Sequence, residues 1–222
     1  GFQLKPIGII EATNYSSLSN APAVLNSAFT IIKTMGFKGL EDKKYFEDTE
    51  LNAIFKPIQS SQAQAFLPKG TNVCFILLES FGTVYCGPNS PESYTPFLDS
   101  LLAQSMFFED AIANSRTSMD ALPSVISSIP AYTNESFILS EYSANQFQGL
   151  PSILKEAGYY SAFFHGANNG SMRFDAFTSA AGFDAYYGRN EYPNPSHFDG
   201  NWGIEDHHML SFAVDEMNRF KK

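Results

Sequence analysis

The sequence predicts an α/β fold in which a mainly parallel sheet is flanked by helices. Residues 73–78 form an uninterrupted apolar run, which is typical of a strand buried on both faces of a parallel sheet. Downstream, short apolar stretches alternate with stretches of helical periodicity, the order that βαβ units produce. Hydrophobic residues make up 44% of the 222 residues, so the chain can bury a sizeable core.

Strands and helices are expected in alternating order from residue 73 onward. Thr95 and Pro96 begin the first helix, because Thr caps helices well and Pro suits their first position. Gly158 and Gly182 end two later helices. Pro123 should distort the first turns of another. The expected strands span residues 73–78, 107–112 and 159–164, and the expected helices span 95–104, 118–128, 150–157, 174–181 and 204–220.

Residues 1–70 are predicted to form a separate, helical N-terminal region. An amphipathic helix is expected over residues 22–35, and a shorter helix over 48–55 is stopped by Pro57. Residues 60–64 are polar and indicate a linker. We therefore divide the chain into this N-terminal region and an α/β region over residues 71–222.

Composition excludes some classes of function. The formal charge is -9, which argues against broad nucleic-acid binding and provides no polybasic patch for anionic lipid. A phosphate-binding site must then be built locally, from a metal ion or a few cations. No run is long and apolar enough to cross a membrane. Cys74 and Cys86 do not make a disulfide framework, and Cys74 is expected to pack as a small hydrophobe.

Three polar side chains follow predicted strands, where ligands bind in parallel sheets. Glu79 ends the strand at 73–78 and offers a carboxylate to a hard cation. Thr117 starts a helix whose free N–H groups suit a phosphate ester, and its hydroxyl becomes a nucleophile once a base or metal activates it. His165 ends the strand at 159–164. Singly, each has an ordinary explanation, as a solvent-facing acid, a helix cap or a histidine bonded to backbone. Their convergence predicts an active site.

Further polar residues lie nearby in the sequence. Asn168 belongs to a loop rich in Gly and Asn that allows close approach of a ligand, and Arg173 could pair with a phosphate oxygen. Asp206, His207 and His208 suggest zinc. Neighbouring helical residues point about 100° apart, however, so both histidines cannot easily face one ion. We expect the two histidines to form mostly a solvated face.

Six segments combine into a specific pattern. They are residues 72–82, ending Leu-Leu-Glu-Ser-Phe-Gly; 95–101, Thr-Pro-Phe-Leu-Asp-Ser-Leu; 115–118, Ser-Arg-Thr-Ser; 164–169, beginning Phe-His-Gly; 182–184, Gly-Phe-Asp; and 202–206, Trp-Gly-Ile-Glu-Asp. Together they resemble the lipoteichoic acid synthase-like phosphoglycerol transferase family, a branch of the sulfatase/alkaline phosphatase superfamily. The match runs from about residue 5 to the end of the chain, and residues 5–60 are similar to the family's extracytoplasmic linker.

The resemblance implies an alkaline phosphatase/sulfatase-like fold and a role for each site residue. Thr117 would be the nucleophile that carries a covalent phospho-intermediate. Glu79 would bind one divalent metal ion, Mn²⁺ first and Mg²⁺ or Zn²⁺ as alternatives, with the Thr117 oxygen also close to the ion. His165, Asn168 and Arg173 would hold the substrate. The implied reaction moves a phosphoglycerol-type group from a phospholipid headgroup donor to a glycan or glycerol-phosphate acceptor in the cell envelope.

The resemblance also implies a location and an incomplete site. The parent protein would be anchored by membrane helices upstream, with this chain on the extracytoplasmic face. The family completes its metal site with an Asp-His pair downstream of Lys222, where a further substrate histidine is also expected. Its Trp-x-Arg pair has no clean match near Met172 and Arg173. We therefore expect a C-terminally truncated fold that, by itself, binds metal weakly or not at all and is inactive.

Four alternative functions remain open at this point. A phosphodiesterase or phosphatase, or a phosphoethanolamine transferase, of the same superfamily would use the same residues. A sulfatase would need formylglycine from a Cys/Ser-x-Pro-x-Arg motif, whereas residues 115–119 are Ser-Arg-Thr-Ser-Met. A non-catalytic ligand-binding module would have no reason to keep both Glu79 and Thr117.

Overall fold

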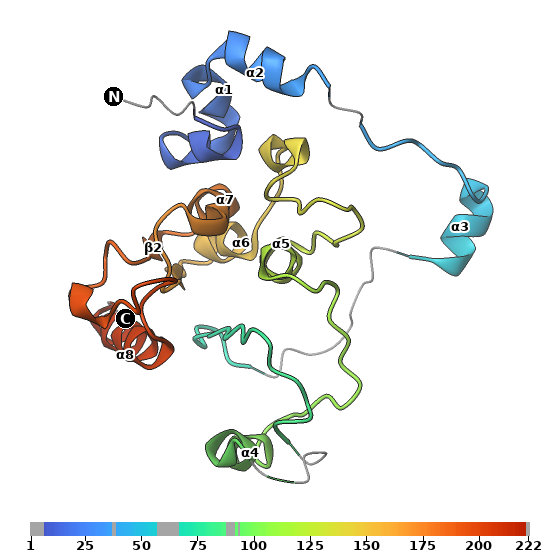
Figure 1. Cartoon of the computed structure of the whole chain (residues 1–222). Coiled ribbons are helices and arrows are strands. Elements are labelled where there is room, and N and C mark those ends of the chain that lie inside the picture. The colour runs from blue at the N-terminus through green and yellow to red at the C-terminus, as the bar shows by residue number, and fades with distance from the viewer. Residues whose placement is uncertain (1–6, 37–38, 57–66, 88–91, 93, 221–222) are drawn as a thin grey trace.

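The computed structural model describes residues 7–36, 39–56, 67–87, 92 and 94–220 (Figure 1). The strands of this part are β1 (Ala162–Phe164) and β2 (Ala185–Tyr187). The α-helices are α1 (Ala21–Val24), α2 (Ser27–Thr34), α3 (Asp48–Ile54), α4 (Pro96–Leu102), α5 (Ser118–Ser127), α6 (Leu150–Glu156), α7 (Phe174–Ala181) and α8 (Asp206–Arg219). The 3₁₀-helices are η1 (Ile10–Asn14), η2 (Leu18–Asn20), η3 (Glu141–Ala144), η4 (Ser171–Arg173) and η5 (Pro195–His197). Among these helices, none has the length and apolar character needed to span a membrane.

β1 and β2 form a parallel pair connected through η4 and α7, and this βαβ unit confirms the predicted α/β class. The register places Phe163 opposite Tyr186. Gly182 ends α7 in the left-handed region at φ 91°, and the N–H of Phe183 donates to the carbonyl of Thr178 at 3.0 Å. This helix-ending motif turns the chain from α7 into β2.

The buried core lies between η1, α5 and α7. Phe177 of α7 is fully buried, with its ring stacked on Phe147 at a centroid distance of 5.4 Å and with Phe137 edge-on at 6.4 Å. Such aromatic pairs add to the stabilisation that area burial gives. The cluster of buried residues comprises Ile10, Leu122, Ile126, Ile138, Phe174, Ala176, Phe177 and Ala181.

The predicted helix over residues 118–128 is confirmed as α5, but the expected distortion at Pro123 is wrong. The helix continues through Pro123, which has no N–H to give to the carbonyl of Met119 four residues earlier. That carbonyl accepts instead from Ser136 Oγ at 3.1 Å. The side chain replaces the missing helical hydrogen bond, so the helix is not broken. α4, α6, α7 and α8 confirm the other predicted helices, with small differences at their ends.

The N-terminal region is helical, but its first predicted helix is divided. Residues 22–35 form α1 and α2, because Leu25 is extended with ψ 142° and Asn26 caps α2. Asn26 Oδ1 accepts from the N–H of Phe29 at 3.0 Å, so this side chain stabilises a new helix start. The predicted helix over 48–55 is confirmed as α3, which Figure 1 places apart from the other helices. The predicted linker at 60–64 lies outside the described residues.

η1 packs directly on α7. Thr13 Oγ1 donates to the carbonyl of Ala176 at 2.9 Å, and Ser179 Oγ donates to the carbonyl of Thr13 at 2.9 Å. Ile10 is fully buried in the same contact. The beginning of the chain therefore shares a core with the βαβ unit, while the division into residues 1–70 and 71–222 stays a prediction.

The strands predicted over residues 73–78 and 107–112 are wrong for this structure. Neither segment pairs with another strand within the described ranges, and the side chains of both are largely exposed, up to 94% for Ile112. Cys74, expected to pack, is exposed as well. A doubly buried strand needs neighbouring strands for its hydrogen bonds and helices for both of its faces. The β1–β2 pair supplies neither of these to the two segments. The third predicted strand, over 159–164, is confirmed in its second half as β1.

Candidate active site

Thr117 stands at the N-cap of α5, in the position where a side chain normally caps the helix. Its Oγ1 instead donates to Asp120 Oδ2 at 2.7 Å. Ser115 Oγ donates to the same carboxylate oxygen at 2.7 Å and accepts from the Thr117 N–H at 3.2 Å. Within the described ranges, the N–H groups of Ser118 and Met119 have no acceptor. The helix therefore offers free donors beside an oriented hydroxyl.

Asp120 is ionised at neutral pH. Burial alone would raise the pKa of this carboxyl, but hydrogen bonds from Ser115 and Thr117, with the Ser136 hydroxyl close by, outweigh burial and hold the pKa below its usual 3.8. The ionised carboxylate acts only as an acceptor, so it fixes the direction of the Thr117 O–H bond. The oxygen lone pairs of Thr117 are left to face away from Asp120.

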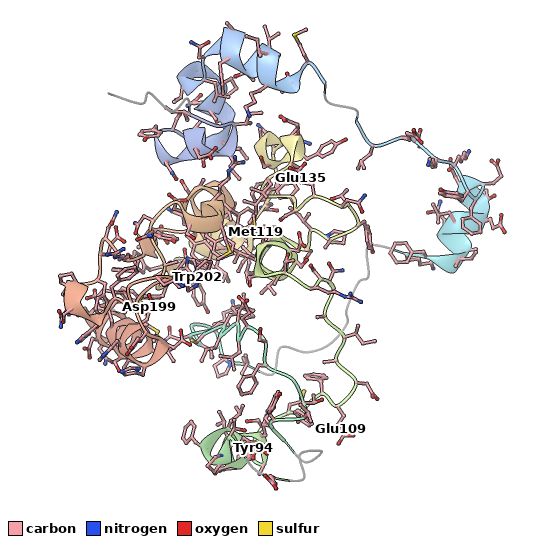
Figure 2. The ribbon with its side chains drawn as sticks, viewed as in Figure 1. Tyr94, Glu109, Met119, Glu135, Asp199 and Trp202 are labelled. Carbon is pink, nitrogen blue, oxygen red and sulfur yellow. The ribbon has the colours of Figure 1, made fainter. Side chains whose placement is uncertain are left out.

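Glu79 lies beside this helix start. Ser118 Oγ donates to Glu79 Oε2 at 2.6 Å, so the residue next to Thr117 ties the Glu79 carboxylate to α5. Ser80, which follows Glu79, adopts a left-handed conformation at φ 56° and turns the chain there. The two predicted residues Glu79 and Thr117 are thus brought to one place although 38 positions separate them in the numbering. Figure 2 labels Met119 in the first turn of α5, which marks the location of this site.

The oxygen groups at this place fit a hard divalent cation. Glu79 supplies an exposed carboxylate, Thr117 an exposed hydroxyl, and Asp120 a second carboxylate alongside. Oxygen donors of this kind suit Mn²⁺ or Mg²⁺ better than they suit metals that prefer nitrogen or sulfur. The donor chemistry is therefore compatible with the Mn²⁺ or Mg²⁺ that the family resemblance implies.

His165 is held at the end of β1 by the neighbouring strand. The backbone N–H of His165 donates to the backbone carbonyl of Tyr187 at 2.9 Å, and the ring nitrogen Nδ1 lies 3.3 Å from the hydroxyl of Tyr186. The ring also packs against Phe174 at a centroid distance of 5.0 Å. Burial lowers the pKa of His165 below 6.5, so the ring is neutral at neutral pH and acts as a hydrogen-bonding group.

Asn168 and Arg173 each have a partner within the chain. Asn168 Oδ1 accepts from Arg189 Nη1 at 2.7 Å. Arg173 Nε lies 2.8 Å from Glu11 Oε1, with about a third of each side chain exposed. Arg173 is also in the left-handed region at φ 55°. An anion that binds Arg173 must therefore share the guanidinium with Glu11 or displace it.

The five predicted site residues fall into two groups. Glu79 and Thr117 are linked through the start of α5, whereas His165, Asn168 and Arg173 all follow β1 along the chain. Across the described residues, no hydrogen bond or ion pair joins one group to the other. The roles predicted for the five residues stay predictions.

Sequence reasoning missed two residues at this site, Asp120 and Ser118. Thr117-x-x-Asp120 has the spacing of a helix capping box, in which each side chain would bond to backbone N–H groups. That spacing could have signalled that the two side chains lie together. The direct bond between them leaves the backbone donors free.

Comparison with known proteins identifies the family. The family model described as Sulfatase matches residues 71–222. The lipoteichoic acid synthase-like protein YvgJ of Bacillus subtilis (strain 168) is 24% identical over 219 residues, which cover 96% of this chain and 33% of that protein. The chain thus spans about a third of the length of this curated relative.

Two solved structures resemble parts of the chain. One is a protein of the alkaline phosphatase superfamily from Vibrio parahaemolyticus, with a TM-score of 0.41 and 26% identity over 44% of this chain and 24% of that one. The other is the lipoteichoic acid synthase LtaP from Listeria monocytogenes, with a TM-score of 0.41 and 22% identity over 46% of this chain and 24% of that one. The family model covers more than half of the sequence, and the chain therefore belongs to the Sulfatase family.

Proposed function

We propose that this chain carries the nucleophile and part of the metal site of a phosphotransferase. The enzyme moves a phosphoglycerol-type group from a phospholipid donor to a glycan or polyol acceptor through a phospho-threonine intermediate. One observation carries the proposal. Thr117 Oγ1 is oriented by the ionised Asp120 at 2.7 Å, at a helix start that Ser118 ties to Glu79 at 2.6 Å.

The start of α5 suits a phosphoryl group. The free N–H groups of Ser118 and Met119 and the positive end of the helix dipole favour an anion at this position. A phosphate there lies next to the Thr117 hydroxyl, so the nucleophile and the group it attacks share one binding place. Positioning of this kind is a large part of the catalysis of phosphoryl transfer.

Two displacements complete the transfer. In the first, Thr117 Oγ1 forms a bond to phosphorus, and the bond from phosphorus to the lipid alcohol breaks. The departing lipid oxygen takes up a proton from water and leaves as the free alcohol. The hydroxyl proton leaves on the side of Asp120, to which it is already hydrogen-bonded. In the second, an acceptor hydroxyl forms a bond to phosphorus, and Thr117 regains its proton as the leaving group.

One divalent ion, with Mn²⁺ preferred and Mg²⁺ or Zn²⁺ as alternatives, would be held by Glu79 and Thr117. When bound, such an ion supplies Lewis-acid chemistry that lowers the pKa of a hydroxyl and stabilises charge on phosphoryl oxygens. Glu79 and Thr117 provide only two of about six oxygens that a hard cation of this type takes. This chain by itself is therefore proposed to bind the ion weakly and to be inactive, and the complete reaction belongs to the longer protein.

His165, Asn168 and Arg173 are proposed to hold the donor headgroup. A neutral His165 would hydrogen-bond a glycerol hydroxyl, whereas Arg173 would contact a phosphate oxygen in place of Glu11. We place the reaction at the extracytoplasmic face of the membrane, in a membrane-anchored parent protein, since the donor is a membrane lipid.

The alternative acceptors and cargo use the same intermediate. Water in place of the acceptor alcohol makes the enzyme a phosphodiesterase or phosphatase, and a phosphoethanolamine headgroup changes the cargo without changing Thr117. Sulfate-ester chemistry is not proposed despite the name of the family, because residues 115–119 lack the motif that yields formylglycine.

The test is intact-mass analysis of the longer protein after incubation with Mn²⁺ and phosphatidylglycerol. The expected result is a mass increase of one phosphoglycerol in the parent, its loss in Thr117→Ala and its return in Thr117→Ser, which keeps a hydroxyl. Release of free headgroup with no adduct would favour the hydrolase. An adduct of equal size in Thr117→Ala would show that another residue is the nucleophile.

A further inference from the structure

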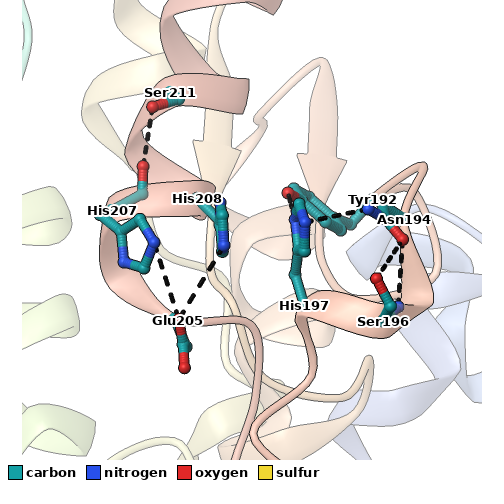
Figure 3. Close-up of polar contacts among 8 residues, drawn as sticks. All are labelled: Tyr192, Asn194, Ser196, His197, Glu205, His207, His208 and Ser211. Carbon is teal, nitrogen blue, oxygen red and sulfur yellow. Dashed lines mark hydrogen bonds and ion pairs between the residues drawn. The ribbon is translucent and has the colours of Figure 1, made fainter.

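Three potential metal ligands meet at the start of α8 (Figure 3). Glu205 Oε2 lies 3.6 Å from His207 Nε2 and 3.9 Å from His208 Nε2. One ligand atom from each of the three residues lies within 4.8 Å of the others. None of these residues belongs to the site at Glu79 and Thr117.

The local backbone explains how neighbouring residues converge. Glu205 is the N-cap of α8, with ψ 140°, so it precedes the helix and its side chain returns over the first turn. The rings of His207 and His208 lie next to each other, with centroids 3.9 Å apart, and the Glu205 carboxylate faces one nitrogen of each, as Figure 3 shows. The expectation that two adjacent helical histidines cannot share an ion considered the helix alone. The third ligand, Glu205, comes from outside the helix, and its carboxylate is in contact with both histidine rings.

His208 is held in place by stacking. Its ring lies parallel to that of His197, with centroids 3.5 Å apart and planes 8° apart, and its side chain is 31% exposed. The expected solvated face is therefore confirmed for His207, at 69% exposed, but wrong for His208. The isolated bridge between Phe198 and Ile204 brings the two stacked residues together.

His197 positions His208 and is not itself a free ligand. Its Nδ1 lies 2.6 Å from the hydroxyl of Tyr192, and its Nε2 lies 2.9 Å from Asn194 Nδ2. By contrast, within the part of the chain that the structure describes, the ring nitrogens of His207 and His208 have no polar partner besides Glu205. Two imidazoles and one carboxylate are thus available together.

We propose that Glu205, His207 and His208 bind one Zn²⁺ ion at a site separate from the proposed catalytic site. Two histidines and one carboxylate form a ligand set that zinc uses with a fourth position left for water. Atoms about 2.05 Å from a tetrahedral zinc lie roughly 3.3 Å apart. The distances of 3.6 and 3.9 Å from Glu205, and the limit of 4.8 Å that holds for all three pairs, exceed this value, so side-chain rotations must draw the three ligand atoms together when the ion binds. Imidazole ligands also favour zinc over Mn²⁺ or Mg²⁺, so the two sites differ in the ion that each selects.

The test is a Zn²⁺ titration of the untagged chain, followed by calorimetry and by NMR of the histidine rings. Cys74 and Cys86 are first changed to Ser, because free thiols also bind zinc. The chain has four histidines, so each ring gives a separable signal. We expect binding of one ion, with large shifts for His207 and His208 and little change for His165.

Matched variants separate the proposed site from its rivals. His207→Gln and His208→Gln are each expected to weaken zinc binding at least tenfold, whereas Glu79→Gln and His165→Gln leave the affinity unchanged. His207 is largely exposed, so its substitution leaves the fold intact. No saturable binding, or equal affinity in His207→Gln and the parent, would overturn the proposal. A loss of affinity confined to Glu79→Gln would also overturn it, because the zinc would then occupy the oxygen site.

Discussion

Arg173 Nε lies 2.8 Å from Glu11 Oε1, so a carboxylate of the N-terminal region occupies the guanidinium that we assign to phosphate binding. Glu11 belongs to η1, which packs on α7, and Arg173 immediately precedes that helix. The carboxylate therefore stands where a donor phosphate would pair. If Arg173 binds the donor as we propose, binding of the donor and docking of η1 would compete for one cation.

Glu11→Gln is expected to tighten donor binding. The ion pair is partly exposed and contributes about 1 kcal/mol or less, so KM for the phospholipid donor should fall by up to about fivefold. The measurement is steady-state transfer by the longer protein. Glu41→Gln removes the same charge from an exposed pair with Lys43 and should leave KM unchanged. A rise in KM for Glu11→Gln would contradict the assigned competition.

Asp120→Asn is expected to slow the chemical step. An amide does not hold the Thr117 hydroxyl as an ionised acceptor does, so kcat should fall by about a hundredfold while KM changes little. Single-turnover formation of the covalent intermediate measures this directly. Asp110→Asn, at an exposed carboxylate, serves as the control. An unchanged rate in Asp120→Asn would mean that Asp120 only holds the side chains of Ser115 and Thr117 in place.

Asp184 is expected to make stability depend on pH. Burial raises the pKa of this carboxyl, but Lys155 and the N–H and hydroxyl of Ser161 outweigh burial and hold the pKa below 3.8. The folded protein therefore binds this proton less readily than the unfolded chain. The stabilisation is fully present above the unfolded pKa, and it is lost as the pH falls through the folded pKa.

Urea unfolding at pH 7 and at pH 3 checks this expectation. Asp184→Asn should lower the free energy of unfolding at pH 7, and its difference from the parent should shrink at pH 3. Asp215→Asn, at an exposed position of α8, should show no such pattern. A constant difference at both pH values would assign the loss to packing instead of charge.

Gly203→Ala is expected to destabilise the protein by about 1–3 kcal/mol. A Cβ at Gly203 would lie 2.6 Å from the carbonyl oxygen of Gly166, the residue after His165. The clash is with backbone, so the loop carrying His165 must shift. Gly36→Ala meets nothing within 4 Å and should change the free energy of unfolding much less. Urea unfolding gives both values, and the ring signal of His165 should move only in Gly203→Ala.

The helices could be predicted because their signals are local. Gly182 and the Thr95–Pro96 pair mark ends that the neighbouring residues alone determine. The division between α1 and α2 was missed because the hydrophobic pattern continues through Leu25. A single hydrogen bond, from the Phe29 N–H to Asn26 Oδ1, caps the second helix and separates it from the first. The periodicity of hydrophobic residues does not indicate which polar side chain accepts a hydrogen bond from a backbone N–H.

The strands and parts of the site depend on partners distant in the sequence. A segment such as 73–78 has the composition of a strand, but pairing decides whether the strand forms. Glu79 and Thr117 were predicted together because both follow expected strands. Asp120 was missed because its spacing from Thr117 also suits an ordinary cap. The cluster at Glu205 was missed because the sequence argument considered only the directions of helical residues from 206 onward. Glu205 precedes the helix, so its side chain does not follow that geometry.

The exposed run at residues 73–78 has a consequence for handling the protein. Six consecutive apolar residues without charge or Pro form a segment prone to intermolecular β-pairing, and five of them are more than half exposed, from 52% to 63%. The charge that directly follows this run is that of Glu79, which therefore acts as a gatekeeper against self-association. Glu79→Gln should aggregate at lower concentration than the parent, as light scattering would show. On this expectation the proposed metal ligand also limits self-association, so activities of its variants must be compared on the monomer fraction.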